Sequence, residues 1–269
     1  MGILQNGGFM LDDFTPIVHE FKGNEQVKIY PIADLHIGSP ECRIEAWYEF
    51  IEKLKSEPRS YLTIGGDMMD NGLKNSKTNV YGQTMRPRDQ KRWLVEQLTP
   101  ARDRILCIVS GNHEARNADF DDNPLYDVAC KLDLEDVYRE NGAFLILRIG
   151  DVNGSGKRNP TYTGLVQHGT GGGGTIGGQV NKLTKYAMAF EGLDFVVSGH
   201  THKPFNVPDA RLVLDAHNKR IIEKPFRAIT ATSWLKYGGY GFGKQHAPAA
   251  YSLAEILLEG NKKQLRVLQ

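Results

Sequence analysis

The sequence predicts an α/β protein with both parallel and antiparallel strand pairing. Through the first two thirds of the 269 residues, short buried apolar runs alternate with stretches of helical periodicity. This alternation is typical of parallel strands joined by helices. From about Leu212 the pattern changes to short β-like runs separated by turn residues, which favours antiparallel pairing.

The first strand and helix illustrate how each element is assigned. Residues 27–32 read as a buried strand, and Ser39 and Pro40 then supply a cap and a first-turn proline. Apolar residues recur at spacings of three and four from Ile44 to Leu54, and Pro58 ends the helix. The same criteria predict strands at 61–64, 105–109, 143–149, 163–167, 195–198, 212–216, 220–223, 227–231, 251–258 and 264–268, and helices at 88–98, 125–131 and 179–190.

Composition excludes several classes of protein. Thirty-three Lys and Arg residues and 32 Asp and Glu residues give a net charge of +1. This overall charge favours neither nucleic acid nor a membrane surface as a partner. Hydrophobic content of 40% is typical of a soluble globular chain, and we expect residues 1–269 to form a single domain. The three cysteines form no C-x-x-C pair, and we find no leader or membrane-spanning segment, so a cytoplasmic location is expected.

Five short polar motifs follow the ends of predicted strands. They are Asp34-Leu35-His36, Gly66-Asp67-Met68-Met69-Asp70, Gly111-Asn112-His113-Glu114, Gln167-His168-Gly169 and Gly199-His200-Thr201-His202. D-x-H and G-D-x-x-D alone are common loop patterns, whereas G-N-H and G-H-x-H are each rare for this composition. Because ligands of open α/β sheets bind beyond the carboxyl ends of the strands, we expect these side chains to converge.

The chemistry of the motifs predicts a centre of two metal ions. Imidazole nitrogen and carboxylate oxygen together suit Mn, Fe or Zn better than an all-oxygen Ca or Mg cage, and one Asp can bridge two ions. Residues two apart lie on the same side of an extended strand. On that geometry Asp34 and His36 would meet one ion, and His200 and His202 would do the same.

The ordered set of motifs over residues 27–205 resembles the calcineurin-like metallophosphoesterases. The resemblance implies a four-layer α/β/β/α sandwich of two mixed sheets. It also implies that Asp67 bridges two metal ions, with His113 protonating the leaving group or stabilising phosphoryl charge and Asp70 orienting a histidine. In this arrangement the remaining ligands are Asp34, His36 and His202 for the first ion and Asn112, His168 and His200 for the second.

The predicted function is hydrolysis of phosphate mono- or diesters at two divalent ions, with Mn²⁺ favoured and Fe, Zn, Ni or Mg as alternatives. Ions about 3.5 to 4 Å apart activate a shared hydroxide for in-line attack on phosphorus. One alternative is an exonuclease that processes DNA ends, with a nucleotide or nucleic acid as substrate. A second is a scaffold of this fold that has no catalytic activity. The oligomeric state is left open.

Three further segments are candidate substrate contacts. Residues 74–104 carry eight basic and three acidic side chains, and Arg86, Arg88 and Lys91 are the proposed phosphate contacts. The alternative is a solvated helix face. The glycine-rich run 169–178 and the run 237–243 are expected to be flexible loops, either facing the substrate or serving as plain connectors.

Overall fold

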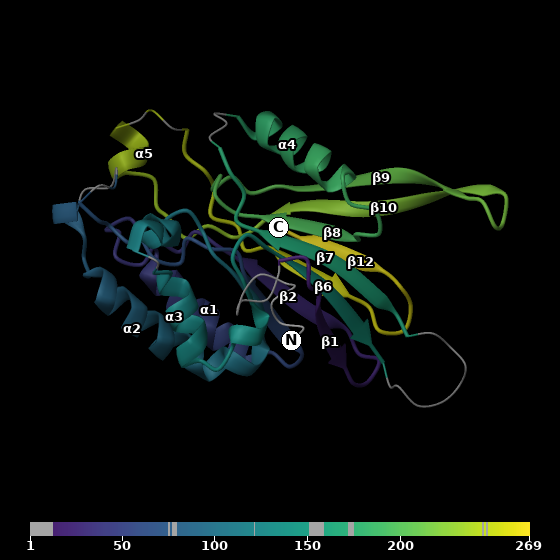
Figure 1. Ribbon diagram of the computed structural model, residues 1–269, viewed down its shortest axis with the longest axis horizontal. Coiled ribbons are helices and arrows are strands. Elements are labelled where there is room, and N and C mark those ends of the chain that lie inside the picture. Colours follow the sequence, from purple (N-terminus) through teal and green to yellow (C-terminus); the bar gives the residue numbers. More distant parts are fainter. Residues whose placement is uncertain are drawn as a thin grey trace, which may run out of the picture.

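The computed structural model confirms the α/β/β/α architecture. It describes residues 13–74, 76, 80–120, 122–150, 159–171, 175–243, 245 and 247–269. In this part of the chain two six-stranded mixed sheets pack face to face, with helices on both outer sides (Figure 1). No helix among these residues combines the length and apolar character needed to cross a bilayer.

The first sheet carries the parallel strands from the first half of the chain. Its strand order is β12-β11-β2-β3-β4-β5, in which β2 to β5 are parallel and β11 and β12 are antiparallel. Three helices pack on its outer face: α1 (Ile44–Ser56), α2 (Pro87–Leu98) and α3 (Pro124–Lys131). Its strands are β2 (Val27–Ile32), β3 (Ser60–Ile64), β4 (Ile105–Val109), β5 (Tyr138–Arg139), β11 (Glu255–Leu258) and β12 (Leu265–Leu268).

The second sheet has the order β1-β6-β7-β8-β10-β9 and carries α4 (Ile176–Met188) on its outer face. Strands β7, β8 and β10 are parallel, whereas β9 pairs antiparallel with β10 at one edge. Its strands are β1 (Ile17–Phe21), β6 (Gly142–Ile149), β7 (Thr161–Gln167), β8 (Phe195–Ser198), β9 (Asn206–Asp215) and β10 (Arg220–Thr230).

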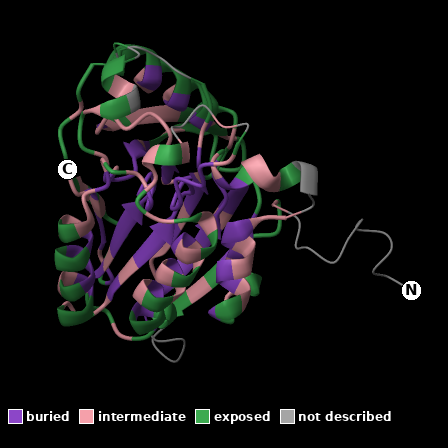
Figure 2. Cartoon of the chain, turned by 90° about the vertical axis from the view of Figure 1, so that its left-hand side faces the viewer, coloured by how far each residue is buried: buried purple, intermediate pink, exposed green. Residues whose placement is uncertain are grey.

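Strand alternation builds the layers of the core. In β2, Val27 and Ile29 pack between the two sheets, while Tyr30 and Ile32 pack under the helices. Both faces of this strand are therefore largely buried, and Lys28 near its start is its one charged residue. Figure 2 shows the same arrangement, with buried strands enclosed by helices whose outer faces are exposed.

Some predicted elements were wrong in extent or missed. The runs 220–223 and 227–231 form one strand, β10, because pairing with β9 continues through Pro225. The run 251–258 shortens to β11, and β1 was not predicted because its pattern is half exposed. The expected loop at 237–243 contains a short helix, α5 (Gly239–Gly243), and part of the glycine-rich loop, residues 172–174, lies outside the described residues.

Candidate metal centre

The five motifs meet at one edge of the two sheets. Strands β2, β3 and β4 are parallel in one sheet and β7 and β8 in the other, so their carboxyl ends carry the motif loops. The sheets are joined at this edge, because the amide of Ala33 donates to the carbonyl of Thr232 at 3.2 Å. A Cβ on Gly199 would lie 2.7 Å from the Cβ of Ala33, so only glycine permits this approach.

The motif residues lie in loops rather than on extended strands, which corrects the geometry expected for D-x-H and G-H-x-H. Strand β2 ends at Ile32, before Asp34 and His36. These two residues have left-handed backbones with φ of 52° and 50°. Such values are uncommon outside glycine and persist where the surrounding structure holds them in place. The same left-handed conformation occurs at Asp67, His200 and His202.

One group of side chains that could hold a metal ion consists of Asp34, His36 and His202. Nε2 of His202 lies 3.2 Å from Oδ1 of Asp34, and Nε2 of His36 lies 3.8 Å from the same oxygen. The backbone amide of His200 donates to both oxygens of Asp34 at 2.9 and 3.1 Å, which orients the carboxylate. A loop from the second sheet thereby positions a ligand candidate on the first.

A neighbouring group consists of Asp67, His168 and His200. Nε2 of His168 lies 3.2 Å from Oδ2 of Asp67, 3.0 Å from Oδ1 of Asn112 and 3.2 Å from Nδ1 of His200. Because the other ring nitrogen of His168 donates to the carbonyl of Gly65 at 2.8 Å, the lone pair of the neutral ring is on Nε2. Nε2 of His168 thus faces the possible ligand atoms of Asp67, Asn112 and His200.

The buried ring of His36 provides a test of whether the site suits metal. Among the described residues, neither ring nitrogen of His36 has a hydrogen-bond partner, although both are buried. Nε2 lies 3.7 Å from Oδ2 of Asp67, too far for a hydrogen bond, and a buried polar atom without a partner is costly. A cation between these atoms would satisfy both groups, and the mixed nitrogen and oxygen donors suit a transition metal.

Strong electrostatic coupling links these groups. Burial alone would lower the pKa of His36, but the carboxylates of Asp34, Asp70 and Asp67 raise it to about 10. Burial likewise opposes protonation of His168, yet Asp67 raises the pKa of that ring to about 9. Burial alone would raise the pKa of Asp34, but His202 and His36 hold it well below its usual range. The cluster therefore attracts cations, either protons or metal ions.

His113 borders the cluster as a neutral imidazole. Its Nδ1 donates to the carbonyl of Asp70 at 2.8 Å, and its Nε2 accepts from Nη2 of Arg116 at 2.7 Å. Burial, followed by the charge of His36, lowers the pKa of His113 to about 3. The carboxylate of Asp70 lies 3.5 Å from Nδ1 of His113 and 3.4 Å from Nδ1 of His36, so it faces both rings.

Three residues that support this cluster had little or no sequence signal. Arg116 follows His113 by one turn of the 3₁₀ segment Glu114–Phe120, a spacing visible only once that turn is known. The second is Gln83, which donates from Nε2 to Oδ2 of Asp70. The third is the buried Gln90, whose side chain donates to Oε1 of Gln83 at 3.0 Å. An isolated glutamine in a loop carries no pattern that would have identified it.

Glu114 connects two of the motif loops through hydrogen bonds to their backbone amides. Its fully buried carboxylate accepts the backbone amides of Asp67, Met69 and Gly111 at 2.9 to 3.0 Å. Burial, together with the nearby charge of Asp67, raises the pKa of Glu114. The three hydrogen bonds from backbone amides offset this penalty, so Glu114 acts as a brace for the motif loops.

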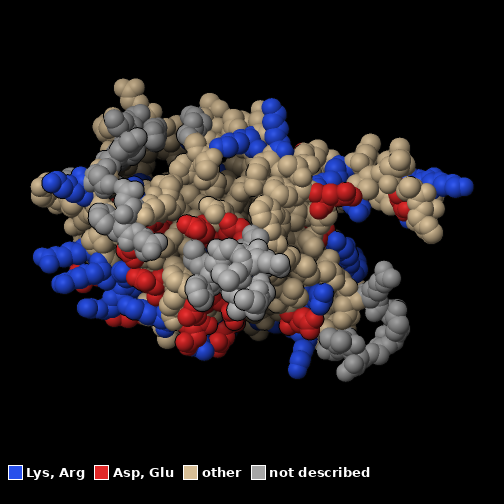
Figure 3. All heavy atoms as spheres, viewed as in Figure 1, with Lys and Arg blue, Asp and Glu red and all other residues tan. Residues whose placement is uncertain are grey.

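None of the contacts in the described part of the chain joins Arg86, Arg88 or Lys91 to the cluster. Lys91 forms an ion pair with Asp127 of α3 at 2.6 Å, which directs its ammonium toward the neighbouring helix. Arg88 is exposed and lies 3.7 Å from Asp89, and Arg86 is exposed at the start of α2. Figure 3 shows Lys and Arg side chains projecting from the α2 end of the molecule. The exposure of Arg86 and Arg88 fits the alternative of a solvated helix face, and the phosphate contacts stay a prediction.

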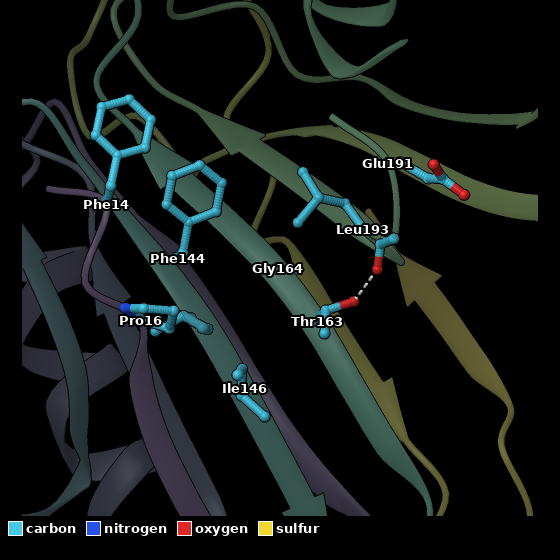
Figure 4. A pocket seen from close by; sticks show the side chains of 10 residues that line it. Phe14, Pro16, Phe144, Ile146, Thr163, Gly164, Glu191 and Leu193 are labelled. Carbon is cyan, nitrogen blue, oxygen red and sulfur yellow. Dashed lines mark hydrogen bonds between the residues drawn. The ribbon is translucent and has the colours of Figure 1, made fainter. Parts of the chain in front are cut away.

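A groove of about 300 Å³ lies elsewhere, on the outer face of the second sheet (Figure 4). Phe14 stacks on Phe144 at 5.9 Å along its wall, and Leu193 closes another side. The hydroxyl of Thr163 is already bonded to the carbonyl of Gly192. None of the motif side chains lines this groove, so the chemistry of the motifs belongs to the sheet edge.

Comparisons with known proteins identify the family of this chain. Residues 27–204 match the family model described as calcineurin-like phosphoesterase. Among solved structures, the chain is similar to a calcineurin-like phosphoesterase, YfkN from Bacillus subtilis, with 12% identity, 91% of each chain covered and a TM-score of 0.41. It is also similar to a nuclease, MPE from Pseudomonas putida, with 15% identity, 89% of this chain and 87% of that chain covered and a TM-score of 0.34. No curated protein sequence matches. The family match covers well over half of the 269 residues, so the chain belongs to the calcineurin-like phosphoesterases, hydrolases of phosphoester bonds.

Proposed function

We propose that this chain hydrolyses phosphate mono- or diesters at a centre of two divalent metal ions. The observation that carries the proposal is the position of Asp67, which belongs to two overlapping groups of possible ligands, one with His36 and His113 and the other with His168 and His200. Asp34, His36 and His202 would hold one ion and Asn112, His168 and His200 the other, with Asp67 between them. When bound, such a pair generates a nucleophile from water at neutral pH and neutralises phosphoryl charge.

The chain's own residues would position and protonate the substrate. Arg116 and His113 lie side by side at the border of the ligand groups, where an anionic phosphate would be stabilised by the guanidinium. A nearby anion favours the protonated imidazole, so substrate binding would raise the low pKa of His113. We propose that His113 then protonates the leaving oxygen, while Asp70 holds the ring through its carbonyl.

The decisive experiment is metal analysis and hydrolysis of an aryl phosphodiester by the Asp67→Asn variant. We expect the wild-type chain to bind two Mn²⁺ ions and the variant to lose at least a hundredfold in activity, about 2.7 kcal/mol of transition-state stabilisation. Asp103→Asn is the matched control, because Asp103 is exposed and pairs only at the surface with Arg102. Full activity in Asp67→Asn, or less than one ion per wild-type chain, would refute the proposal.

The substrate class is tested separately by comparing an aryl phosphodiester, an aryl phosphomonoester and single- and double-stranded DNA with Mn²⁺ present. We propose that the small esters are cleaved in preference to DNA. Of the three proposed phosphate contacts, Lys91 forms a close ion pair with Asp127 of α3, so its charge is directed away from a nucleic-acid backbone at the metal centre. Cleavage of DNA alone would favour the nuclease alternative. We also propose a single cytoplasmic domain, which is consistent with free Cys42, Cys107 and Cys130.

A further inference from the structure

The hairpin formed by β9 and β10 exposes large apolar side chains far from the metal centre. Leu212 and Leu214 are each 72% exposed, and Ile221, which lies opposite Leu214, is 67% exposed. Figure 1 shows the hairpin projecting beyond the other strands, and Figure 3 shows it largely tan with charged side chains near its end. An exposed edge strand with apolar side chains can pair with a strand of another chain, and soluble proteins normally avoid such edges.

The backbone of β9 is oriented for pairing with another strand. Antiparallel strands alternate hydrogen-bonded and non-hydrogen-bonded pairs, and proline cannot donate, so Pro208 with Arg227 and Ala210 with Pro225 must be pairs of the second kind. The amide of Ala210 agrees, because it donates to the side chain of Asp209 at 2.8 Å. By the same alternation, Leu212 and Leu214 direct their amides and carbonyls away from β10.

We propose that β9 pairs antiparallel with β9 of a second copy of this chain, about a two-fold axis at Val213. This register sets Leu212 of each copy opposite Leu214 of the other, and Arg211 opposite Asp215. Both exposed leucines gain a partner. Arg211, which also donates to the carbonyl of Ala187 at 3.2 Å, lies opposite the carboxylate of Asp215, which also accepts from Asn218. Centring the axis on Leu212 instead would oppose Asp209 to Asp215, two like charges. The complementary register joins the two second sheets into one continuous sheet.

The proposed interface leaves the metal centre open. Strand β10 is parallel to β8, whose carboxyl end leads to His200, so the turn that precedes β10 lies at the opposite end of the sheet. Each copy is therefore expected to retain its own site. Hydrolysis of the aryl phosphodiester per chain then serves as a readout of folding for variants of the hairpin.

The test is the mass of the protein by light scattering at tens of micromolar. We expect twice the chain mass of 30.1 kDa for the wild type, and 30.1 kDa for Leu212→Lys with unchanged hydrolysis per chain. Ile221→Lys is the matched control, since Ile221 shares the exposed face but lies one strand inside the edge, so it should remain dimeric. A monomeric wild type, or dissociation caused equally by Ile221→Lys, would overturn pairing through the edge.

A second measurement tests the register. A Val213→Cys variant places two thiols opposite each other on the axis in a non-hydrogen-bonded pair, whose Cα separation of about 4.5 Å lies within the range of a disulfide. We expect oxidation to cross-link it into a covalent dimer, whereas Leu212→Cys, which faces Leu214, should cross-link at least tenfold more slowly. Equal cross-linking of the two variants would contradict an axis at Val213.

Discussion

Asp67 and His168 join the two sheets, with Oδ2 of Asp67 lying 3.2 Å from Nε2 of His168. Asp67 follows β3 in the first sheet, and His168 follows β7 in the second. Neither residue is near the other in sequence, yet their pairing places a carboxylate between two groups of imidazoles. The candidate site is therefore a property of how the sheets pack, and several consequences of that packing can be measured.

The buried brace Glu114 should matter for stability. Glu114→Ala leaves the amides of Asp67, Met69 and Gly111 without acceptors, and each unsatisfied buried group costs about 1–3 kcal/mol. We expect the free energy of unfolding to fall by at least about 3 kcal/mol in urea titrations. Glu114→Gln retains one oxygen and should lose about half as much. Equal stability of Glu114→Ala and wild type would show that the loops do not depend on this carboxylate.

Gln83 should influence the metal centre without touching it. It donates to Asp70, whose carboxylate faces Nδ1 of His36 at 3.4 Å. Gln83→Leu removes that donor, and loss of such outer partners typically lowers metal affinity or activity by about 10- to 100-fold. We expect about tenfold weaker Mn²⁺ binding by calorimetry and a lower kcat with little change in KM. Gln97→Leu, on the same helix as Lys91, should alter neither quantity.

The metal-free chain should lose stability as pH rises above neutrality. In the folded chain His36 and His168 have pKa values of about 10 and 9, above the ordinary value of 6.5, so the folded state binds protons more tightly. The resulting stability is complete below pH 6.5 and is lost as pH rises through 9 to 10. In EDTA, we expect the free energy of unfolding to fall by up to about 1.4 kcal/mol per pH unit for each ring.

Urea titrations at pH 6.5, 7.5 and 8.5 measure this dependence. The variant His36→Asn should show a shallower slope, whereas exposed His217→Asn should keep the slope of the wild type. His113 does not enter this range, because its lowered pKa acts only below 6.5. A flat profile for the wild type in EDTA would contradict the coupling of the imidazoles to Asp34 and Asp67.

Two glycines should respond in opposite directions to alanine. Gly66 has φ of 84°, and its added Cβ would lie 2.5 Å from the amide nitrogen of Gly111, so Gly66→Ala should cost several kcal/mol and reduce activity. Gly177 lies in α4 with nothing within 4 Å of an added Cβ. Gly177→Ala should therefore stabilise the chain by roughly 0.5–1 kcal/mol. Thermal unfolding of both variants checks the pair, and a neutral Gly66→Ala would exclude the predicted crowding.

Local patterns in the sequence predicted many of the strands and helices. Strands such as β2 and β4 were predictable because nearly all of their side chains are buried, so their sequences are mainly apolar. Strand β1 was missed, since half of its side chains face solvent, and β10 was split at Pro225, whose missing amide matters little where the pair is not hydrogen-bonded. Helix α4 begins three residues earlier than expected, at a Thr175 cap that its glycine-rich first turn obscured.

The sequence by itself determined which chemical groups are present and that they follow strand ends, because ligand types and turn glycines are local features. It could not supply the left-handed backbones of Asp34 and His36, the neutral ring of His113 beside Arg116, or the contact of Gln83 with Asp70. Each depends on segments brought together by the packing of the sheets. Local patterns record what a residue is, whereas its neighbours, charge and hydrogen-bond partners are decided by tertiary contacts between distant parts of the chain.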